Sequence, residues 1–350
     1  MPPSRHFFWR LPPPVYAKCL EFLKKKTILY IAAALFIIGG VAPALIHPNI
    51  WVILFFRALI GIGVGICLPL STDLVVDFFE DEERHSMMGY VSATVGISGI
   101  MFQLLGGYLA GIRWNYTFYA YLVSVIFFLF SFIFLPEPDR QAKIAAQEGA
   151  EEVQATVPGS VYLVAFIFGI YFLLWYVLPS NGAIVLLGEK MADPAQIGLA
   201  FAFVTVGSFI SSVLFKWLFR AFEYRLLPIS FVVSAAGFYI CFISHTFMVF
   251  TMGATFLGLG LGMVVPATMT KLSGLVPYSA AAKAISIGYF GMGVGGFLQP
   301  LVFNLFSEPG RATFLIGALA MLVFTAVMYA VDKSTPVKAT PEASSEASPA

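Results

Sequence analysis

Charged residues are scarce in this sequence. Asp, Glu, Lys and Arg make up 11% of its 350 residues, whereas 59% are hydrophobic and the mean hydropathy is +0.87. A soluble domain carries about 25% charged residues, so this composition is typical of an integral membrane protein. The net charge of +1, without a basic stripe, indicates no nucleic-acid partner.

The residues that carry enzymatic and metal chemistry are scarce as well. The three cysteines, Cys19, Cys67 and Cys241, have neither metal-ligand spacing nor the pattern of a disulfide framework. The four histidines form no H-E-x-x-H motif, and the sequence contains no G-x-S-x-G elbow and no P-loop. We therefore expect no enzyme activity, no metal site and no cofactor, and ATP-driven pumping is not indicated.

In place of charge the sequence has ten long apolar runs. Each is long enough to cross a bilayer as a helix, and the short alternating segments of a β-barrel are absent. No Asp or Glu lies inside any of these runs. The sequence therefore predicts an all-α integral membrane protein with ten transmembrane helices. The predicted spans are 27–46, 50–71, 87–110, 115–135, 159–181, 195–216, 226–244, 247–267, 284–305 and 312–331.

Lysine and arginine are distributed unevenly between the two sides of these spans. If residues 1–26 face the cytoplasm, sixteen of the 20 basic residues lie on the cytoplasmic side. Arg113, Lys190 and Arg311 lie on the outer side, and Arg57 lies inside a span. Because cytoplasmic loops carry the excess of Lys and Arg, we expect both termini in the cytoplasm and the chain in the plasma membrane.

A glycine-rich pattern occurs twice. It reads G-x-G-x-G-x-x-x-P, and the second copy begins 197 residues after the first. This offset indicates a duplicated half, the usual plan of secondary transporters, in which the substrate site lies between the halves. Small residues at this spacing let helices pack closely, so we expect a packing role for them. The glycines are Gly61, Gly63 and Gly65 before Pro69, and Gly258, Gly260 and Gly262 before Pro266.

The two halves are unequal. Moved back by the repeat offset, the spans at 159–181 and 195–216 fall before or at the start of the chain. The first half is therefore expected to lack its first helix and most of its second, about sixty residues of a twelve-helix plan. The resulting division is an incomplete four-helix half over 1–135, a cytoplasmic linker over 136–158, a six-helix half over 159–332 and a disordered tail over 333–350.

Three local motifs accompany the repeat. Residues 17–26 occupy the place of a G-x-L-a-D-R-x-G-r-K loop, and Arg57, Gly61 and Gly63 read R-x-x-x-G-x-G. Asp77, Glu83, Arg84 and Gly89 then follow the pattern D-x-x-x-x-x-E-R-x-x-x-x-G. With two related halves and a cytoplasmic middle loop, the chain resembles the major facilitator superfamily over residues 14–332.

The resemblance implies a helical bundle that works by alternating access, and it is nearest to drug–proton antiporters. Those antiporters often carry Gly-Pro before a Gly-Gly in the fifth helix, whereas this chain has Phe102-Gln103 before Gly106-Gly107. The resemblance also implies a cytoplasmic charge cluster that latches one conformation, the alternative being a solvated charged loop. The latch residues are Glu21, Lys24, Lys25, Asp77 and Arg84.

A few polar and aromatic residues inside the spans are candidates for substrate binding. Arg57 lies about 10 Å into its helix, where a charge is costly and usually faces a cavity or a partner. The alternatives are an arginine that snorkels outward or one bonded to backbone carbonyls. Tyr171 and Trp175 share a helix face because they are four residues apart. The full set is Arg57, Gln103, Tyr171, Trp175, Asn181 and Gln299, which suits an amphipathic or anionic organic molecule.

The functional expectation is secondary active transport of a small organic solute by alternating access, in the form of proton-coupled efflux. The expected partners are the solute, protons and the lipid bilayer, with the protein acting as a monomer. Two alternatives stay open. One is uptake of a sugar or metabolite, and the other is a truncated membrane protein that does not transport. No carboxylate lies inside the spans. This argues against proton coupling by this chain, because proton coupling normally needs a titratable group within the membrane.

Overall fold

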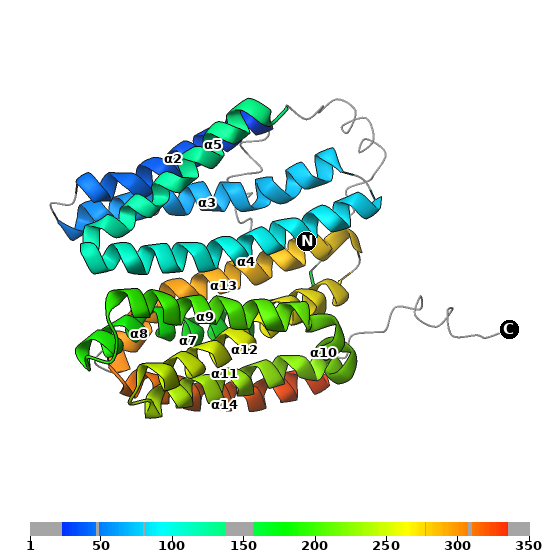
Figure 1. Cartoon of the computed structure of the whole chain (residues 1–350). Helices are drawn as coiled ribbons and strands as arrows, with labels where there is room; N and C mark the ends of the chain where they lie inside the picture. The colour runs from blue at the N-terminus through cyan, green and yellow to red at the C-terminus, as the bar shows by residue number, and fades with distance from the viewer. Residues whose placement is uncertain are drawn as a thin grey trace, which may run out of the picture. The chain divides into compact units, whose positions relative to one another are not determined.

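The computed structural model describes residues 23–46, 49–79, 81–136, 157–276, 278–306 and 310–334. These residues fold into α-helices and two short 3-10 helices, and no strand occurs among them (Figure 1). The elements of the first part are α2 (Lys25–Leu45), α3 (Ile50–Phe78), α4 (Asp81–Ile112), η1 (Trp114–Leu122) and α5 (Val123–Phe134). Those of the second part are α7 (Gly159–Trp175), α8 (Val177–Gly188), α9 (Pro194–Val213), α10 (Phe215–Phe222), η2 (Glu223–Arg225), α11 (Leu226–Ile243), α12 (Phe247–Gly274), α13 (Tyr278–Phe306) and α14 (Ala312–Ser334).

Ten segments of the described chain are long and apolar enough to cross a membrane, which confirms the predicted all-α, multi-pass class. Several helices are longer than the predicted spans. For example, α3 continues to Phe78, and α12 continues to Gly274. An apolar run marks only the part of a helix that lies in hydrocarbon, whereas the backbone hydrogen bonds continue through polar residues at the interface.

The repeat offset that the glycines show also relates the helices. The first residues of α12 and α13, Phe247 and Tyr278, each lie 197 positions after the first residues of α3 and α4. The caps repeat in the same way. Asn49 Oδ1 accepts from the Val52 amide at 3.0 Å, and Thr246 Oγ1, again 197 positions later, accepts from the Val249 amide at 3.4 Å. Both side chains satisfy an N–H group that a helix start leaves free.

The chain forms two compact units. Unit 1 comprises residues 1–95 and 112–151, and unit 2 comprises residues 96–111 and 152–350. The second half of α4 therefore groups with unit 2, although the sequence division places it in the first half. The reason is a close approach of α4 to α9, because a Cβ added at Gly107 would lie 2.7 Å from the Cα atom of Gly198.

Unit 1 has a small core between α2 and α3, made by Ile28, Ala32, Ile66 and Leu70. Gly63 permits this contact, because an added Cβ would lie 2.7 Å from the carbonyl oxygen of Ala32. Helix α2 also packs against η1. Helix α5 has no buried residue, which is expected where apolar side chains face lipid instead of a protein core.

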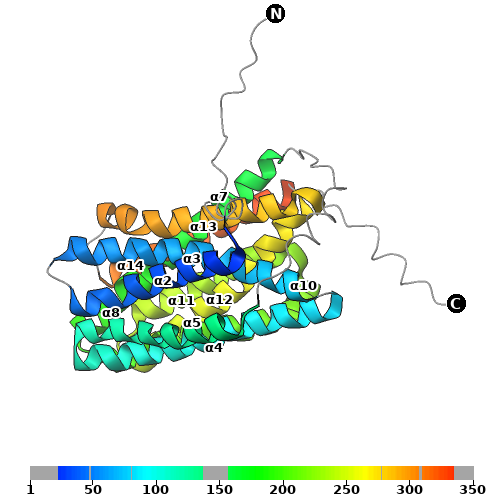
Figure 2. The ribbon, with the colours of Figure 1, turned by 90° about the horizontal axis from the view of Figure 1, so that it is seen from above.

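Unit 2 holds the large core. Helix α11 packs between α12 and α14, and α12 also packs on α9. Figure 1 shows α11 beside α14, and Figure 2 shows α7 beside α13, a pair that is in contact. Aromatic side chains fill the centre of this unit. Tyr171, Phe231, Phe238, Phe250 and Phe314 are each at most 1% exposed.

Candidate functional site

A cavity of about 350 Å³ lies within unit 2. Its wall comes from α4, α7, α8, α9 and α12, and it is mostly apolar. Gln103, Thr205 and Ser208 supply the polar groups, and Trp175 and Phe201 supply aromatic rings. No charged side chain of the described residues lines it. The volume and this balance are typical of a site for a small organic ligand.

Gln103 is a lining side chain whose hydrogen bonding is incomplete. Its Nε2 donates to Thr205 Oγ1 at 2.8 Å, whereas its Oε1 is buried and has no partner among the described residues. Gly99 and Gly107, each four residues from Gln103 on the same helix face, allow α4 to approach α9 closely. A Cβ added at Gly99 would lie 3.4 Å from Thr205 Cγ2, and one added at Gly107 would lie 2.7 Å from Gly198 Cα. The absence of side chains at these glycines therefore places Gln103 against α9.

Trp175 lies at the junction of α7 and α8 and is half-buried. Its indole Nε1 donates to the Leu257 carbonyl at 3.4 Å. Its ring centroid is 6.1 Å from that of Phe172 and 5.5 Å from that of Tyr176. The neighbouring rings limit the movement of the indole, so it forms a fixed flat surface on the cavity wall.

Three other predicted binding residues of unit 2 do not line this cavity. Tyr171 is fully buried, its hydroxyl lies 2.8 Å from Ser234 Oγ, and its ring packs on α11. Asn181 Nδ2 donates to the Val177 carbonyl of its own helix at 3.3 Å. Gln299 Oε1 accepts from Ser180 Oγ at 2.7 Å and links α8 to α13. Each of the three side chains has a hydrogen-bond partner within the protein, and none belongs to the lining of this cavity. Their role in binding stays a prediction.

Helix α9 contributes cavity residues that the predicted set omitted. Phe201, Thr205 and Ser208 follow the spacing i, i+4, i+7, which places them on one helix face. This spacing is visible in the sequence. It does not distinguish a face that lines a cavity from one that packs on a neighbouring helix, because both show the same period.

Arg57 of unit 1 lies over two aromatic rings of η1. Its Nη1 donates to the Tyr121 hydroxyl at 2.9 Å, and its Cζ lies 5.2 Å from the ring centroid of Phe118 and 6.0 Å from that of Tyr121. The side chain is nevertheless exposed, and a guanidinium has five N–H groups to donate. The rings hold the charge in place by cation–π attraction and leave donors for a ligand.

The predicted charge latch lies largely outside what the structure describes. Glu21 falls outside the described residues, and so do the side chains of Asp77 and Arg84. Lys24 and Lys25 stand at the start of α2. The latch stays a prediction.

The glycines of the second repeat copy lie at helix contacts. An added Cβ at Gly258 would overlap the Val204 carbonyl of α9, and one at Gly262 would overlap the Ser208 carbonyl. Gly260 faces α11 in the same manner, through Ser234. Close approach of α12 to both neighbours therefore requires glycine at these positions.

In the first copy the environment differs between the glycines. Gly63 faces α2, the counterpart of the helix that Gly260 faces. At Gly61 and Gly65, in contrast, no heavy atom of the described residues lies within 4 Å of an added Cβ. The expected packing role is therefore not seen at these two positions. The repeat offset pairs α9 with a stretch that ends at residue 16, and that stretch lies outside the described residues.

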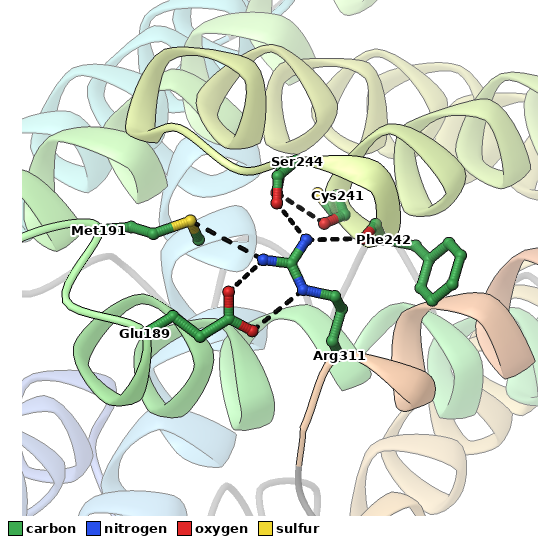
Figure 3. A network of polar contacts seen from close by, with 6 residues as sticks. All are labelled: Glu189, Met191, Cys241, Phe242, Ser244 and Arg311. Atoms are coloured by element: carbon green, nitrogen blue, oxygen red, sulfur yellow. Dashed lines mark hydrogen bonds and ion pairs between the residues drawn. The ribbon is translucent and has the colours of Figure 1, made fainter.

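A polar network that the sequence analysis missed joins the ends of α8, α11 and α14 (Figure 3). Arg311 Nε donates to Glu189 Oε1 at 3.0 Å, and Nη2 pairs with the second carboxylate oxygen. Arg311 Nη1 donates to the carbonyls of Phe242, at 2.8 Å, and Ser244. Such a bidentate, charge-assisted arrangement is stronger than a single surface ion pair. The hydrogen bond from Arg311 holds the pKa of Glu189 below the ordinary value for glutamate.

The stability of unit 2 is therefore expected to depend on the protonation of Glu189. A lowered folded-state pKa means that the stabilisation is complete above the unfolded-state pKa, about 4.3, and is lost as the pH falls through the folded-state pKa. The midpoint of thermal unfolding of Glu189→Gln should lie below that of the wild-type protein at pH 7, and the two should converge in acid.

Glu223→Gln serves as a control, because Glu223 has no ion pair among the described residues. Its unfolding midpoint should stay close to that of the wild-type protein at pH 7. A wild-type to Glu189→Gln difference that does not change between pH 7 and acid would contradict the assignment.

Comparison with known proteins identifies the family. The chain matches the Major Facilitator Superfamily over residues 13–186 and 161–350, which together cover nearly its whole length. The chain therefore belongs to the Major Facilitator Superfamily. The ten helices of the described chain that are long and apolar enough to cross a membrane, and their duplicated order, agree with this membership.

Two curated relatives and one solved structure illustrate the similarity. Multidrug resistance protein 3 of Bacillus subtilis is 32% identical over 107 residues, 30% of this chain and 21% of that protein. Vacuolar basic amino acid transporter 2 of Saccharomyces cerevisiae is 25% identical over 331 residues, 87% of this chain and 66% of that protein. The crystal structure of a D-xylose-proton symporter has a TM-score of 0.70 at 17% identity and covers 89% of this chain and 82% of the symporter.

These relatives differ in how far they inform function. The aligned part of this chain spans about a fifth of the first curated relative and 66% of the second. The likeness to the symporter, at 17% identity, shows the fold alone. Family and fold thus establish a multi-pass membrane protein of a transporter superfamily.

Proposed function

We propose that this protein moves a small organic solute across the plasma membrane by alternating access, as proton-coupled efflux. The observation that carries the proposal is the cavity of about 350 Å³ among spanning helices of a Major Facilitator Superfamily chain. The described residues contain no group of His, Cys, Asp and Glu that could hold a metal ion, and the family is one of transporters rather than enzymes. The name of the relative from Bacillus subtilis, a multidrug resistance protein, supports efflux of amphipathic compounds.

The lining of the cavity favours an amphipathic solute over a strongly charged one. A basic amino acid, the substrate in the name of the yeast relative, needs carboxylates to offset its positive groups. The described lining has none. Aromatic and amide side chains instead suit a flat, largely apolar molecule with few polar groups.

Arg57 is the proposed site for charge. It lies inside a predicted span, and the aromatic rings of Phe118 and Tyr121 hold its guanidinium. We assign it either direct contact with an anionic part of the solute or linkage to proton movement. Both roles require a positive charge that stays at this depth.

The orientation proposed for the chain places both termini in the cytoplasm, with the protein acting as a monomer. The excess of Lys and Arg on one side supports the orientation. Reporter fusions after Lys338 and within residues 141–155 should both read inside, and an outside reading at either position would contradict it.

Transport can be tested in inside-out membrane vesicles from cells that produce the chain. With an imposed proton gradient, the vesicles should accumulate the uncharged amphipathic dye Nile red, and collapsing the gradient with an ionophore should release it. Vesicles with the empty vector are the control. Arginine and xylose, tested in the same vesicles, examine uptake of a basic amino acid or sugar. Absence of gradient-dependent movement of all three compounds would contradict the proposed function and favour a membrane protein that does not transport.

A further inference from the structure

We propose that Gln103 is a specificity-determining residue, whose Oε1 accepts a hydrogen bond from an N–H or O–H group of an uncharged aromatic solute. The solute would lie against Trp175 and Phe201. This inference rests on the proposed function, because it names the class of compound that the cavity of unit 2 takes. It goes beyond that function in assigning the recognising atom and the group that it recognises.

The first support is the unsatisfied acceptor. Gln103 Oε1 is buried and has no partner, and a buried acceptor without a hydrogen bond is costly. Turning the amide would let its oxygen accept from the Thr205 hydroxyl, which now accepts from Nε2 at 2.8 Å, but it would leave Nε2 in the unpaired position without an acceptor. Gln103 is a lining residue of the cavity, and a small rotation of its amide would present the unsatisfied oxygen to a ligand that donates a hydrogen bond.

The second support is the set of groups around that oxygen. Trp175 and Phe201 offer flat apolar surfaces, and the other wall positions include Leu178 and Leu261. The Trp175 indole N–H is directed to the Leu257 carbonyl, so it does not compete for the Gln103 oxygen. Without a charged group among the described lining residues, an ionised ligand would lose its hydration without compensation.

The cavity size sets the scale of the ligand. About 350 Å³ is near the lower end of the range for small-molecule sites, which accommodates two or three fused or linked rings. A site that hydrogen-bonds a ligand discriminates strongly against an analogue that lacks the donor, because the buried polar group is then left unpaired. We expect a preference of about ten- to a hundredfold for the donor-bearing compound.

A matched pair of probes tests this. 2-Phenylindole carries an N–H donor, and 1-methyl-2-phenylindole has a methyl group in its place. Equilibrium dialysis against the full chain in lipid nanodiscs, corrected with empty nanodiscs for partition into lipid, gives the dissociation constant of each. The wild-type protein should bind 2-phenylindole about ten- to a hundredfold more tightly.

Gln103→Met keeps the length of the side chain and removes the acceptor, so the ratio of the two dissociation constants should fall to near one. Because the ratio is measured on one preparation, a loss of folded protein does not change it. Gln299→Met is the matched control, since neither Gln299 nor its partner Ser180 lines the cavity, and its ratio should equal that of the wild-type protein.

The outcomes separate this inference from the proposed function. Equal binding of both probes by the wild-type protein, no binding of either, or an unchanged ratio in Gln103→Met would each overturn the role of Gln103, whatever the vesicles transport. A ratio that behaves as expected supports the role of Gln103 even if the vesicles move no solute, in which case the proposed transport is what fails.

Discussion

Arg57→Ala is expected to reduce transport at least tenfold while the amount of membrane-inserted protein stays unchanged. The side chain is exposed within unit 1, and its contacts are one hydrogen bond to Tyr121 and two aromatic faces. Cation–π contacts of this kind contribute about 0.5–1 kcal/mol each, so their loss should not unfold the protein. Loss of a charge that a solute or proton pathway uses affects every transport cycle.

Three further substitutions separate the contributions. Arg57→Lys keeps the charge but not the planar fork of donors, so partial transport is expected. Tyr121→Phe removes the hydroxyl that Arg57 contacts and keeps the ring, so it should have a smaller effect than Arg57→Ala. Transport by Arg57→Leu at the wild-type rate, measured in the same vesicles and normalised to protein in the membrane, would show that the charge is not used.

The second large effect is expected from Gly258→Ala, which should lower the free energy of unfolding by about 1–3 kcal/mol or more. A methyl group at this position would overlap the carbonyl oxygen of Val204, which belongs to the backbone of α9 and cannot rotate away. Alanine is otherwise the better helix former by about 1 kcal/mol. A lower stability of Gly258→Ala would therefore show that α12 and α9 are in close contact, whereas a higher stability would show that they are not.

Gly293→Ala is the matched control, because Gly293 lies within α13 of the same unit and an added Cβ there meets no heavy atom of the described residues within 4 Å. It should be neutral or more stable by up to about 1 kcal/mol. Thermal unfolding of the purified variants, followed by size-exclusion of the remaining monomer, measures both. Equal stability of Gly258→Ala and the wild-type protein would show that the contact between these helices is looser than the structure places it.

Much of the fold follows from the sequence without tertiary information. A run of about twenty apolar residues is long enough to span hydrocarbon, and the ten predicted runs correspond to the ten spanning segments. The duplication is also a property of the sequence. The offset read from the glycines at 61–65 and 258–262 recurs in the first residues of α3 and α12 and in their N-caps, Asn49 and Thr246.

The site depended on tertiary structure. Helix α7 is apolar on nearly all sides, so the sequence does not show which face a neighbour covers. Tyr171 and Trp175 were predicted as a pair on one face, yet α11 buries Tyr171 whereas Trp175 borders the cavity. The partner of a polar group is equally hidden, because Gln103 and Thr205 are 102 residues apart, and Arg311 and Glu189 are 122 apart. Local sequence determines how long a helix is and where it begins, whereas only the packing of distant helices decides which of its polar atoms are paired and which are left for a ligand.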